Sequence, residues 1–493
     1  MSILYKIIFS ILILISLEQH ESGAREKERI TSNTIHFLLP ENWKSQAGRV
    51  ISIPVKIYKS INLNPGAPIL WFSGGPGMTN LDYEPPKALL ANHDVVLVGY
   101  RGVDGPLKLD CEEVSEALKG IGKDLLSEES VRNVIQKANA CSKRLISENI
   151  DLNGFTMEQI LLDIDTVIRY LGYDKVNILS GSYGTRLAQL YSKFYTERVH
   201  RVVMIGTNVP GRFVWEPELI EEKIRDYDEH CQNDSYCQSQ TKSIINTFNS
   251  VLDNLPDRWL IFPIDKGKVR VVTFAMMYHN HSALQVIDAY ITAEKGDYSG
   301  IAALSMAYNF IMPDLMVWGE FFSKGMIDYN PTKDYRNEFS NSEYTLGSPL
   351  SELMMDVGED WPTKQPVVGF SKLDTSDVQT LVLNGSLDFS TPHEVIEDEL
   401  IRYLPNSKLV IFNGLGHVAD LLYKKTVIEG ITNYYDFGEV NFTQTSFPVN
   451  FEIDNGFSKI VKIGLLMTTI ITVVLLWVVY KLIQRLRRKL NYR

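Results

Sequence analysis

The residue best placed to do chemistry is Ser182, which lies in a turn made of small residues. The sequence Gly181-Ser182-Tyr183-Gly184 follows an apolar run, Val176–Leu179, and precedes a helical pattern of Leu187, Leu190, Tyr191 and Phe194. So tight a turn between a strand and a helix leaves the serine hydroxyl exposed above the sheet as a candidate nucleophile. Ser180 stands where a Gly-x-Ser-x-Gly motif has its first glycine. Small-residue turns are common after strands, so the motif alone does not establish a function.

Two further polar residues follow later strand patterns. Asp388 comes after Thr380–Leu383, and His417 comes after Leu409–Phe412. We expect both residues at the same sheet edge as Ser182, because the carboxyl ends of parallel strands meet there. His417 would take the proton of the serine hydroxyl and return it to the leaving group, and Asp388 would orient the imidazole. A lone Asp or His in a loop is usually structural, but this joint placement, in the order Ser, Asp, His, is typical of an α/β-hydrolase.

An oxyanion hole is also predicted. The strand Ile69–Phe72 ends in Ser73-Gly74-Gly75-Pro76-Gly77, whose backbone N–H groups can point at a developing negative charge. We expect the N–H groups of Gly75 and Tyr183 to be the donors, each contributing about 3 kcal/mol to transition-state stabilisation.

The elements that must position these residues form an α/β pattern. Short, apolar, β-branched runs predict buried parallel strands at Ile69–Phe72, Asp94–Val98, Val176–Leu179, Val202–Ile205, Thr380–Leu383 and Leu409–Phe412. Apolar residues three and four apart predict a helix from Met157 to Leu171, with a capping box of Thr156 and Gln159. A second capping box is predicted at Thr391-Pro392-His393-Glu394. The alternation stops at residues 212–378, which we interpret as a large, mainly helical cap inserted into a mostly parallel sheet.

With these residues assembled, the chain resembles the α/β-hydrolase serine peptidases that include prolyl aminopeptidase and, more closely, the tripeptidyl aminopeptidases. The resemblance rests on Gly74-Gly75-Pro76-Gly77, on the segment Asp94 to Gly102 leading to Cys111, on Ser182 to Ala188, on Asp388 with Thr391-Pro392, and on Gly416-His417. The chain departs from the family pattern at Ser180, at Ser73, where prolyl aminopeptidases have His, and at Gly99, where the family often has Asp.

The resemblance implies a serine exopeptidase that needs no cofactor and releases residues from peptide N-termini, with a cap that limits access. Acidic side chains of the cap would bind the free amine of the substrate; the candidates are Glu216, Glu218, Glu221 and Glu222. An acidic run is more often a solvated helix face. Two alternatives stay open: an esterase or lipase on the same scaffold, and a surface binding protein without catalytic activity.

The chain has four cysteines, Cys111, Cys141, Cys231 and Cys237. All four follow the predicted signal peptide described below, and an exported chain favours disulfides over metal binding. Sequence order favours the pairs Cys111–Cys141 and Cys231–Cys237. We expect no metal site: neither the pair His279 and His281 nor His230 with its neighbouring cysteines has metal-site spacing. Glycosylation sequons occur at Asn233, Asn384 and Asn441, of which Asn384 ends a predicted buried strand and is not expected to be used.

Both ends of the chain carry targeting features. Residues 1–24 have a basic residue, an apolar run of about 11 residues and a small-residue end, as in a cleaved secretory signal peptide. Residues 463–480 are uncharged and apolar, with Trp477 and Tyr480 at the distal edge, and a basic cluster follows them. This pattern predicts one membrane span with a cytoplasmic tail at 481–493. The predicted organisation is therefore a hydrolase core at 25–211 and 379–440, a cap at 212–378, a stalk at 441–462, the span and the tail. The body would lie outside the cytoplasm.

Composition excludes several other classes. Residues 1–480 carry 43 basic against 60 acidic side chains, a net charge of −17, whereas the last 13 residues carry six basic groups and no acid. The acidic body argues against a nucleic-acid partner. The mean hydropathy of −0.08 excludes a multi-pass membrane protein.

Overall fold

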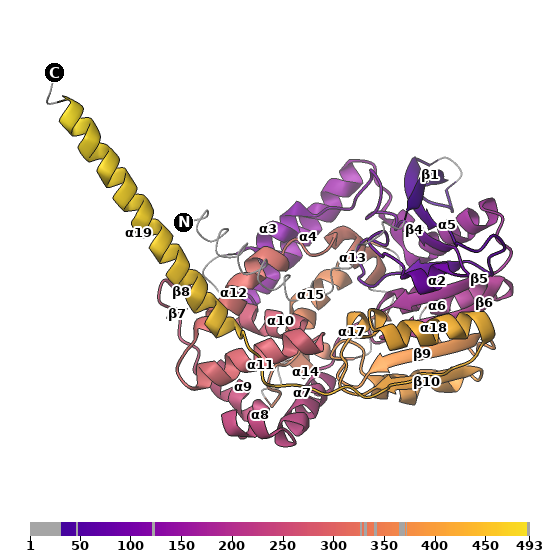
Figure 1. Ribbon diagram of the computed structural model, residues 1–493. Coiled ribbons are helices and arrows are strands. Elements are labelled where there is room, and N and C mark those ends of the chain that lie inside the picture. The colour runs from indigo at the N-terminus through magenta and orange to yellow at the C-terminus, as the bar shows by residue number, and fades with distance from the viewer. Residues whose placement is uncertain are drawn as a thin grey trace.

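The main sheet has eight strands in the order β1-β2-β4-β3-β5-β6-β9-β10 (Figure 1). The computed structural model describes residues 31–45, 48–120, 124–325, 328–329, 333–339, 343–363, 370 and 372–490; the predicted signal peptide lies outside these ranges. The parallel strands are β3 (Ile69–Phe72), β4 (Val95–Val98), β5 (Val176–Gly181), β6 (Val199–Ile205), β9 (Gln379–Gly385) and β10 (Ser407–Phe412). The α/β fold with a mostly parallel sheet is thus confirmed. Two strands that the sequence pattern missed, β1 (Ser32–Pro40) and β2 (Val50–Tyr58), add an antiparallel edge.

Both faces of the sheet are covered by helices, which explains why its strands are apolar throughout. Alternate side chains point to opposite faces: Leu70 and Phe72 pack toward α5 (Met157–Tyr170) and α6 (Gly184–Phe194). Ile69 and Trp71 pack on the other side with α2 (Lys87–Leu90) and α18 (Lys425–Phe437).

The sheet reverses its chain order at β3, which lies between β4 and β5. In open α/β sheets, ligands bind at the carboxyl ends of the strands at such a switch point. Phe72 of β3 lies opposite Ser180 of β5 in the parallel register. The glycine-rich segment after β3 and the Ser182 turn after β5 therefore lie side by side.

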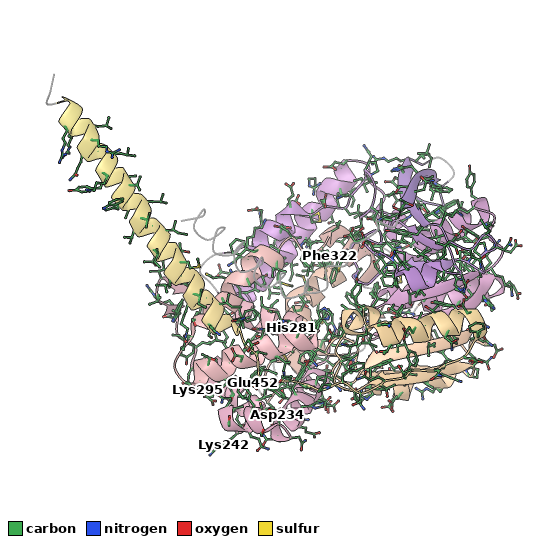
Figure 2. The ribbon with its side chains drawn as sticks, in the orientation of Figure 1. Asp234, Lys242, His281, Lys295, Phe322 and Glu452 are labelled. Atoms are coloured by element: carbon green, nitrogen blue, oxygen red, sulfur yellow. A yellow bond between two sulfur atoms is a disulfide. The ribbon has the colours of Figure 1, made fainter. Side chains whose placement is uncertain are left out.

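A helical layer lies beside the sheet and is inserted between β6 and β9 (Figure 1). Its elements are α7 (Pro217–Gln232), α8 (Ser235–Gln240), α9 (Ile244–Asp253), β7 (Arg258–Trp259), β8 (Phe262–Pro263), α10 (Lys266–Met276), α11 (Asn280–Glu294), α12 (Ser299–Ile311), α13 (Trp318–Gly325), α14 (Tyr335–Phe339) and α15 (Pro349–Glu359). Two helices from before the insertion, α3 (Glu112–Leu118) and α4 (Glu128–Ser147), share its core. Figure 2 labels Phe322, which lies inside this layer and is 1% exposed, and Lys242 at its outer edge. This layer is called the cap below.

Both predicted capping boxes are wrong in their side-chain contacts. Helix α5 begins at Met157 with Thr156 as its N-cap, but the Thr156 side chain caps nothing, and Gln159 Oε1 accepts from Trp43 N at 2.8 Å. The helix after Asp388, α16 (His393–Val395), has Pro392 as N-cap, and Thr391 does not cap it. In each case a side chain predicted to cap the helix binds elsewhere: Gln159 contacts Trp43, and Thr391 contacts Asp388.

The remaining helices are short, except the last. They are η1 (Leu152–Phe155), η2 (Thr196–Arg198), η4 (Ile396–Leu400), η5 (Ile401–Tyr403), α17 (Val418–Leu422) and the long α19 (Phe457–Leu490). Within the described ranges, α19 is the one helix long and apolar enough to cross a membrane, with a mean hydropathy of 2.4, and it contains the predicted span. Figures 1 and 2 show the first turns of α19 against the cap and the rest of the helix projecting into open space.

Candidate active site

Ser182 is held in a strained turn directly after β5. Its φ of 53° is rare for a residue with a side chain, and its backbone N–H donates to Ile205 O at 2.9 Å. Helix α6 starts two residues later at Gly184, where a Cβ would lie 2.2 Å from Phe72 O. A side chain at that position would push the helix off the sheet, so the sequence needs glycine there. Ser180, which replaces the first glycine of the motif, fits inside the sheet because its Oγ donates to Val203 O at 3.1 Å.

Asp388 and His417 form a buried pair at the ends of β9 and β10. His417 Nδ1 lies 2.8 Å from Asp388 Oδ2 and 3.0 Å from Oδ1, and the two residues are 6% and 0% exposed. The carboxylate is fixed by Ser390 N and Thr391 N, each at 2.9 Å, and by the Thr391 hydroxyl at 2.8 Å. The Thr391 side chain thus binds the Asp388 carboxylate instead of capping the helix. The charged carboxylate holds Nδ1 as the protonated nitrogen and leaves Nε2 as the basic one.

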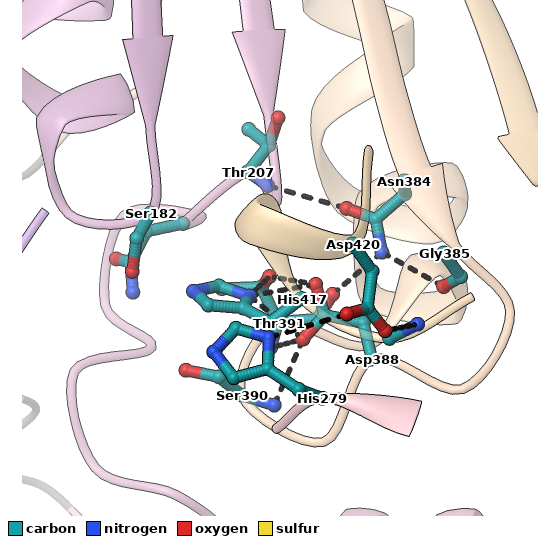
Figure 3. Close-up of polar contacts among 12 residues, drawn as sticks. Ser182, Thr207, His279, Asn384, Gly385, Asp388, Ser390, Thr391, His417 and Asp420 are labelled. Atoms are coloured by element: carbon teal, nitrogen blue, oxygen red, sulfur yellow. Dashed lines mark hydrogen bonds and ion pairs between the residues drawn. The ribbon is translucent and has the colours of Figure 1, made fainter. Parts of the chain in front are cut away.

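The imidazole of His417 lies between Asp388 and Ser182 (Figure 3). Its Nε2 atom is buried and has no hydrogen-bond partner among the described residues. Ser182 is half-buried, and no hydrogen bond joins its hydroxyl to His417 within the described part of the chain. Catalytic hydrogen bonds are often long without substrate and tighten in the complex. A buried, unsatisfied ring nitrogen beside a strained serine is suited to accept the serine proton.

The glycine-rich segment after β3 lies against the serine. A Cβ on Gly74 would come within 2.8 Å of Ser182 Cβ, and Gly75 has a φ of 122° next to a cis peptide bond to Pro76. In the part of the chain that the structure describes, the backbone N–H groups of Gly75 and Tyr183 donate to no protein acceptor. Both are therefore available to a ligand oxygen.

A buried ion pair from the cap, which the sequence analysis did not identify, supports this segment. Glu320 Oε2 of α13 accepts from Gly77 N at 2.6 Å, and Glu320 is paired with Lys324 one turn later. Burial raises the pKa of Glu320, and the Lys324 ammonium opposes that rise. Lys324 also lies 4.1 Å from the centre of the Tyr100 ring. The sequence feature that could have indicated this ion pair is the i,i+4 spacing of Glu320 and Lys324 in a helix that is otherwise rich in aromatic residues.

A second cap contact, also missed, holds the His417 loop. The backbone N–H of His417 donates to Tyr278 O at 2.6 Å. Asp420 accepts from Gly416 N and from Asn280 N, both at 2.8 Å, and lies 3.5 Å from His279 Nδ1 (Figure 3). His279 therefore has Asp420 as a carboxylate partner, a contact that was not predicted from the sequence. Burial alone would raise the pKa of Asp420, but the nearby His279 ring and the hydrogen bonds from the two backbone N–H groups hold it below its usual value.

The four acidic candidates for amine binding are not brought together. Glu216 lines a small pocket beside Thr391, but it is already paired with Arg212 at 2.5 Å and Lys333 at 2.6 Å. Glu221 is buried and accepts from Thr345 N and Oγ1. Glu218 is exposed and Glu222 half-buried on the same helix, α7.

The cysteines form the pairs that sequence order favoured. Cys111 is bonded to Cys141 and Cys231 to Cys237, and both disulfides lie in the cap core. Asn384 is fully buried, and its side chain donates to Thr391 O at 2.9 Å, so its sequon is not accessible in the folded chain.

Comparisons with known proteins agree with this geometry. A family model described as "alpha/beta hydrolase fold" matches residues 67–226, and one described as "TAP-like protein" matches residues 344–446. The serine protease Hip1 of Mycobacterium tuberculosis and that of Mycobacterium bovis are each 23% identical over 214 residues. That segment is 40% of this chain, and the chain spans only about 40% of the length of these relatives.

Among solved structures, a serine hydrolase from Cycloclasticus zankles has a TM-score of 0.39 at 14% identity, covering 83% of this chain and 100% of that one. An esterase from Exiguobacterium antarcticum has a TM-score of 0.36 at 15% identity, covering 78% and 96%. The first family match contains Ser182, and the second contains Asp388 and His417; together they support a place for this chain among the α/β-hydrolases of the tripeptidyl-aminopeptidase-like type.

Proposed function

We propose that this protein is a membrane-anchored serine exopeptidase that hydrolyses peptides from their N-terminus. Ser182 is the nucleophile, His417 the general base and acid, and Asp388 the residue that orients the imidazole. The observation that carries the proposal is the buried Asp388–His417 pair, with a distance of 2.8 Å and an unsatisfied Nε2 on the side of Ser182. The TAP-like family match and the serine protease relatives favour a peptide substrate over other acyl compounds.

The reaction proceeds through an acyl-enzyme. Ser182 Oγ attacks the scissile carbonyl carbon while His417 Nε2 takes the hydroxyl proton, and the C–N bond then breaks as His417 gives that proton to the leaving amine. Water, deprotonated by the same nitrogen, releases the acyl group. Asp388 stays ionised and stabilises the imidazolium that forms at each step.

The negative charge that develops on the carbonyl oxygen is stabilised by the backbone N–H groups of Gly75 and Tyr183. Neither group has an acceptor among the described residues, and the close approach of Gly74 to Ser182 brings the two segments together. Donors fixed before the reaction need no reorganisation as charge develops.

The proposed location is outside the cytoplasm. Two disulfides in the cap suit an oxidising compartment, and α19 supplies one candidate span followed by a basic tail. The signal peptide at residues 1–24, cleaved near Ala24, would direct export.

Peptide amides with free and blocked N-termini test the activity. The full-length protein in detergent is incubated with aminoacyl and tripeptidyl amides, each free or acetylated at the N-terminus, and with short p-nitrophenyl esters. We expect hydrolysis of the free peptides, a loss of at least about tenfold in kcat/KM on acetylation, and no activity in Ser182→Ala. Equal cleavage of acetylated peptides would contradict an exopeptidase, and hydrolysis of esters alone would indicate an esterase.

A further inference from the structure

The beginning of α19 is packed into the cap rather than standing free of it. Ser458, Val461 and Thr468 are buried on one face of the helix, and Ser299 Oγ of α12 donates to Ser458 O at 3.4 Å. Lys462 pairs with Asp297 at 2.6 Å. The cap therefore runs alongside α19 from its first turn to Thr468.

This overlap extends into the apolar stretch of the helix. The charge-free residues begin at 463, directly after Lys462, and Thr468 lies five residues farther, about 8 Å along the helix axis. Amphipathic surfaces that rest in a membrane interface are buried to about 5–10 Å. If Lys462 marks the outer boundary of the hydrocarbon, the edge of the cap reaches the depth of the interface.

That edge of the cap carries exposed apolar side chains. Leu260 and Ile261 at the tip of the β7–β8 hairpin are 61% and 68% exposed, and Phe310 and Ile311 at the end of α12 are 38% and 43% exposed. Two residues after the hairpin, Asp265 N donates to Ser305 Oγ of α12 at 3.0 Å, which keeps the two elements close. Figure 1 shows the hairpin beside the cap end of α19.

The hairpin turn itself is unusual for a solvated surface. Two-residue turns that need positive φ are normally built from Asn and Gly, yet here they are Leu260, with a φ of 52°, and Ile261. The hairpin base is well fixed by a hydrogen bond from Ile264 N to Asp257 O at 2.9 Å. A strained turn that presents two aliphatic side chains to water indicates a function for those side chains.

We propose that Leu260, Ile261, Phe310 and Ile311, the apolar rim of the cap, insert into the outer leaflet of the membrane that α19 crosses. This inference rests on the proposed membrane anchoring and extends it. The cap is then held at the lipid surface by two contacts, the span and the rim. The second contact fixes the rotation of the body about the span, which a single helix cannot do.

The test uses introduced cysteines in the full chain, because all four native cysteines are in disulfides. Ile261→Cys, labelled with an environment-sensitive fluorophore, is reconstituted in nanodiscs with and without lipids that carry a nitroxide high on the acyl chain. Leu63→Cys, in the β2–β3 loop and 97% exposed, is the matched control, and Ile470→Cys reports on the span itself. Ile311→Cys repeats the measurement on a second element in case the hairpin variant misfolds.

We expect the label at 261 and at 311 to lose at least about half of its fluorescence to the nitroxide lipid, with no change at 63. Quenching at 470 without quenching at 261 and 311 would contradict the insertion of the apolar rim, while it would still support α19 as the membrane anchor. No quenching at 470 would overturn the anchor and the rim together. A blue-shifted label at 261 that nitroxide lipids do not quench would show that a second copy of the chain covers the rim, which also overturns the inference.

Discussion

At the scale of single residues, the candidate site depends on backbone positions that admit only one type of side chain. The positive φ of Ser182 is maintained because Gly184 lets α6 approach β3 and Gly74 leaves room for the serine. The imidazole of His417 is oriented by the Asp388 carboxylate, which three other donors hold in place. The positions of the reacting atoms are therefore set before a substrate binds.

Replacing Asp388→Asn tests the orientation of the imidazole. The amide keeps the shape of the carboxylate but no longer favours the tautomer with a free Nε2, so kcat should fall by about 10⁴-fold with little change in KM. Steady-state kinetics on a free tripeptidyl amide measures this, with Asp398→Asn at an exposed position as the matched control. A loss below tenfold would mean that Asp388 does not orient the base.

Gly74→Ala tests how closely the glycine-rich segment approaches the nucleophile. The new methyl group would lie 2.8 Å from Ser182 Cβ and 3.3 Å from its Oγ, so the serine or the segment must shift. A misplacement of this order is expected to lower kcat by about 10²-fold while the protein stays folded. Gly48→Ala is the control, since its nearest neighbour would be an ordinary 3.6 Å away. Wild-type kcat in both variants would exclude the proposed oxyanion arrangement.

At the scale of elements, the cap and the hydrolase sheet hold the site jointly. From the cap, α13 supplies Glu320 to the glycine-rich segment, and the turn before α11 supplies the Tyr278 carbonyl to the His417 loop. Lys223 of α7 reaches Glu394 at 2.6 Å and Ser386 O at 3.2 Å beside the Asp388 loop. The loops that carry the candidate triad are thus braced from the cap side.

The Asp420 contact between cap and sheet makes stability depend on pH. Because the folded-state pKa of Asp420 lies below its unfolded value of about 4, its contribution is complete above that pH and is lost as the pH falls through the folded-state pKa. Asp420→Asn should lower the free energy of unfolding by about 1–3 kcal/mol at pH 7. Urea unfolding at several pH values should show this gap closing in acid.

The exposed Asp454→Asn is the control for loss of a single negative charge and should leave the unfolding curve unchanged at pH 7. A gap between wild type and Asp420→Asn that stayed constant from pH 7 down to about 3 would contradict the role given to the Asp420 carboxylate.

The sequence predicted six of the strands, and with them the proximity of Asp388 and His417, because both follow from short-range patterns and from the position of strand ends. Six apolar runs became strands, and the strand ends alone placed Asp388 near His417. Strand β2 was missed because Pro54 argues against a central strand; in the structure, β4 pairs only with the part after it, from Val55 to Tyr58. The contacts of Glu320 with Gly77, of Tyr278 with His417 and of Asp420 with Asn280 could not be predicted, because the partners lie far apart in the chain and only the docking of the cap brings them together.

At the scale of the whole molecule, the sheet and the cap have separate hydrophobic cores, and both disulfides lie in the cap. The sheet is held by side chains such as the buried Arg101, which joins Asp163 of α5 to the carbonyl of Glu41. The cap has many short helices and relies more on covalent links. From the cap, α19 leads toward the proposed membrane.

The two disulfides should differ in their effect on stability. The Cys111–Cys141 bond closes a loop with a sequence separation of 30, and Cys231–Cys237 one of 6. Loop-entropy arguments give a loss of roughly 3–4 kcal/mol for the double variant Cys111→Ala with Cys141→Ala, and about 2 kcal/mol for Cys231→Ala with Cys237→Ala. Denaturant unfolding of the detergent-solubilised variants measures both values, and the reverse order would contradict this account.

The identity of the nucleophile is tested most directly by covalent labelling. The full-length protein is treated with a fluorophosphonate probe, digested and analysed by mass spectrometry. The account predicts one modified peptide, labelled on Ser182, and no labelling in Ser182→Ala, while Ser180→Ala, a change two residues earlier in β5, is still labelled. Labelling on another residue, or labelling that persists in Ser182→Ala, would contradict the assignment of Ser182, Asp388 and His417 as the catalytic triad.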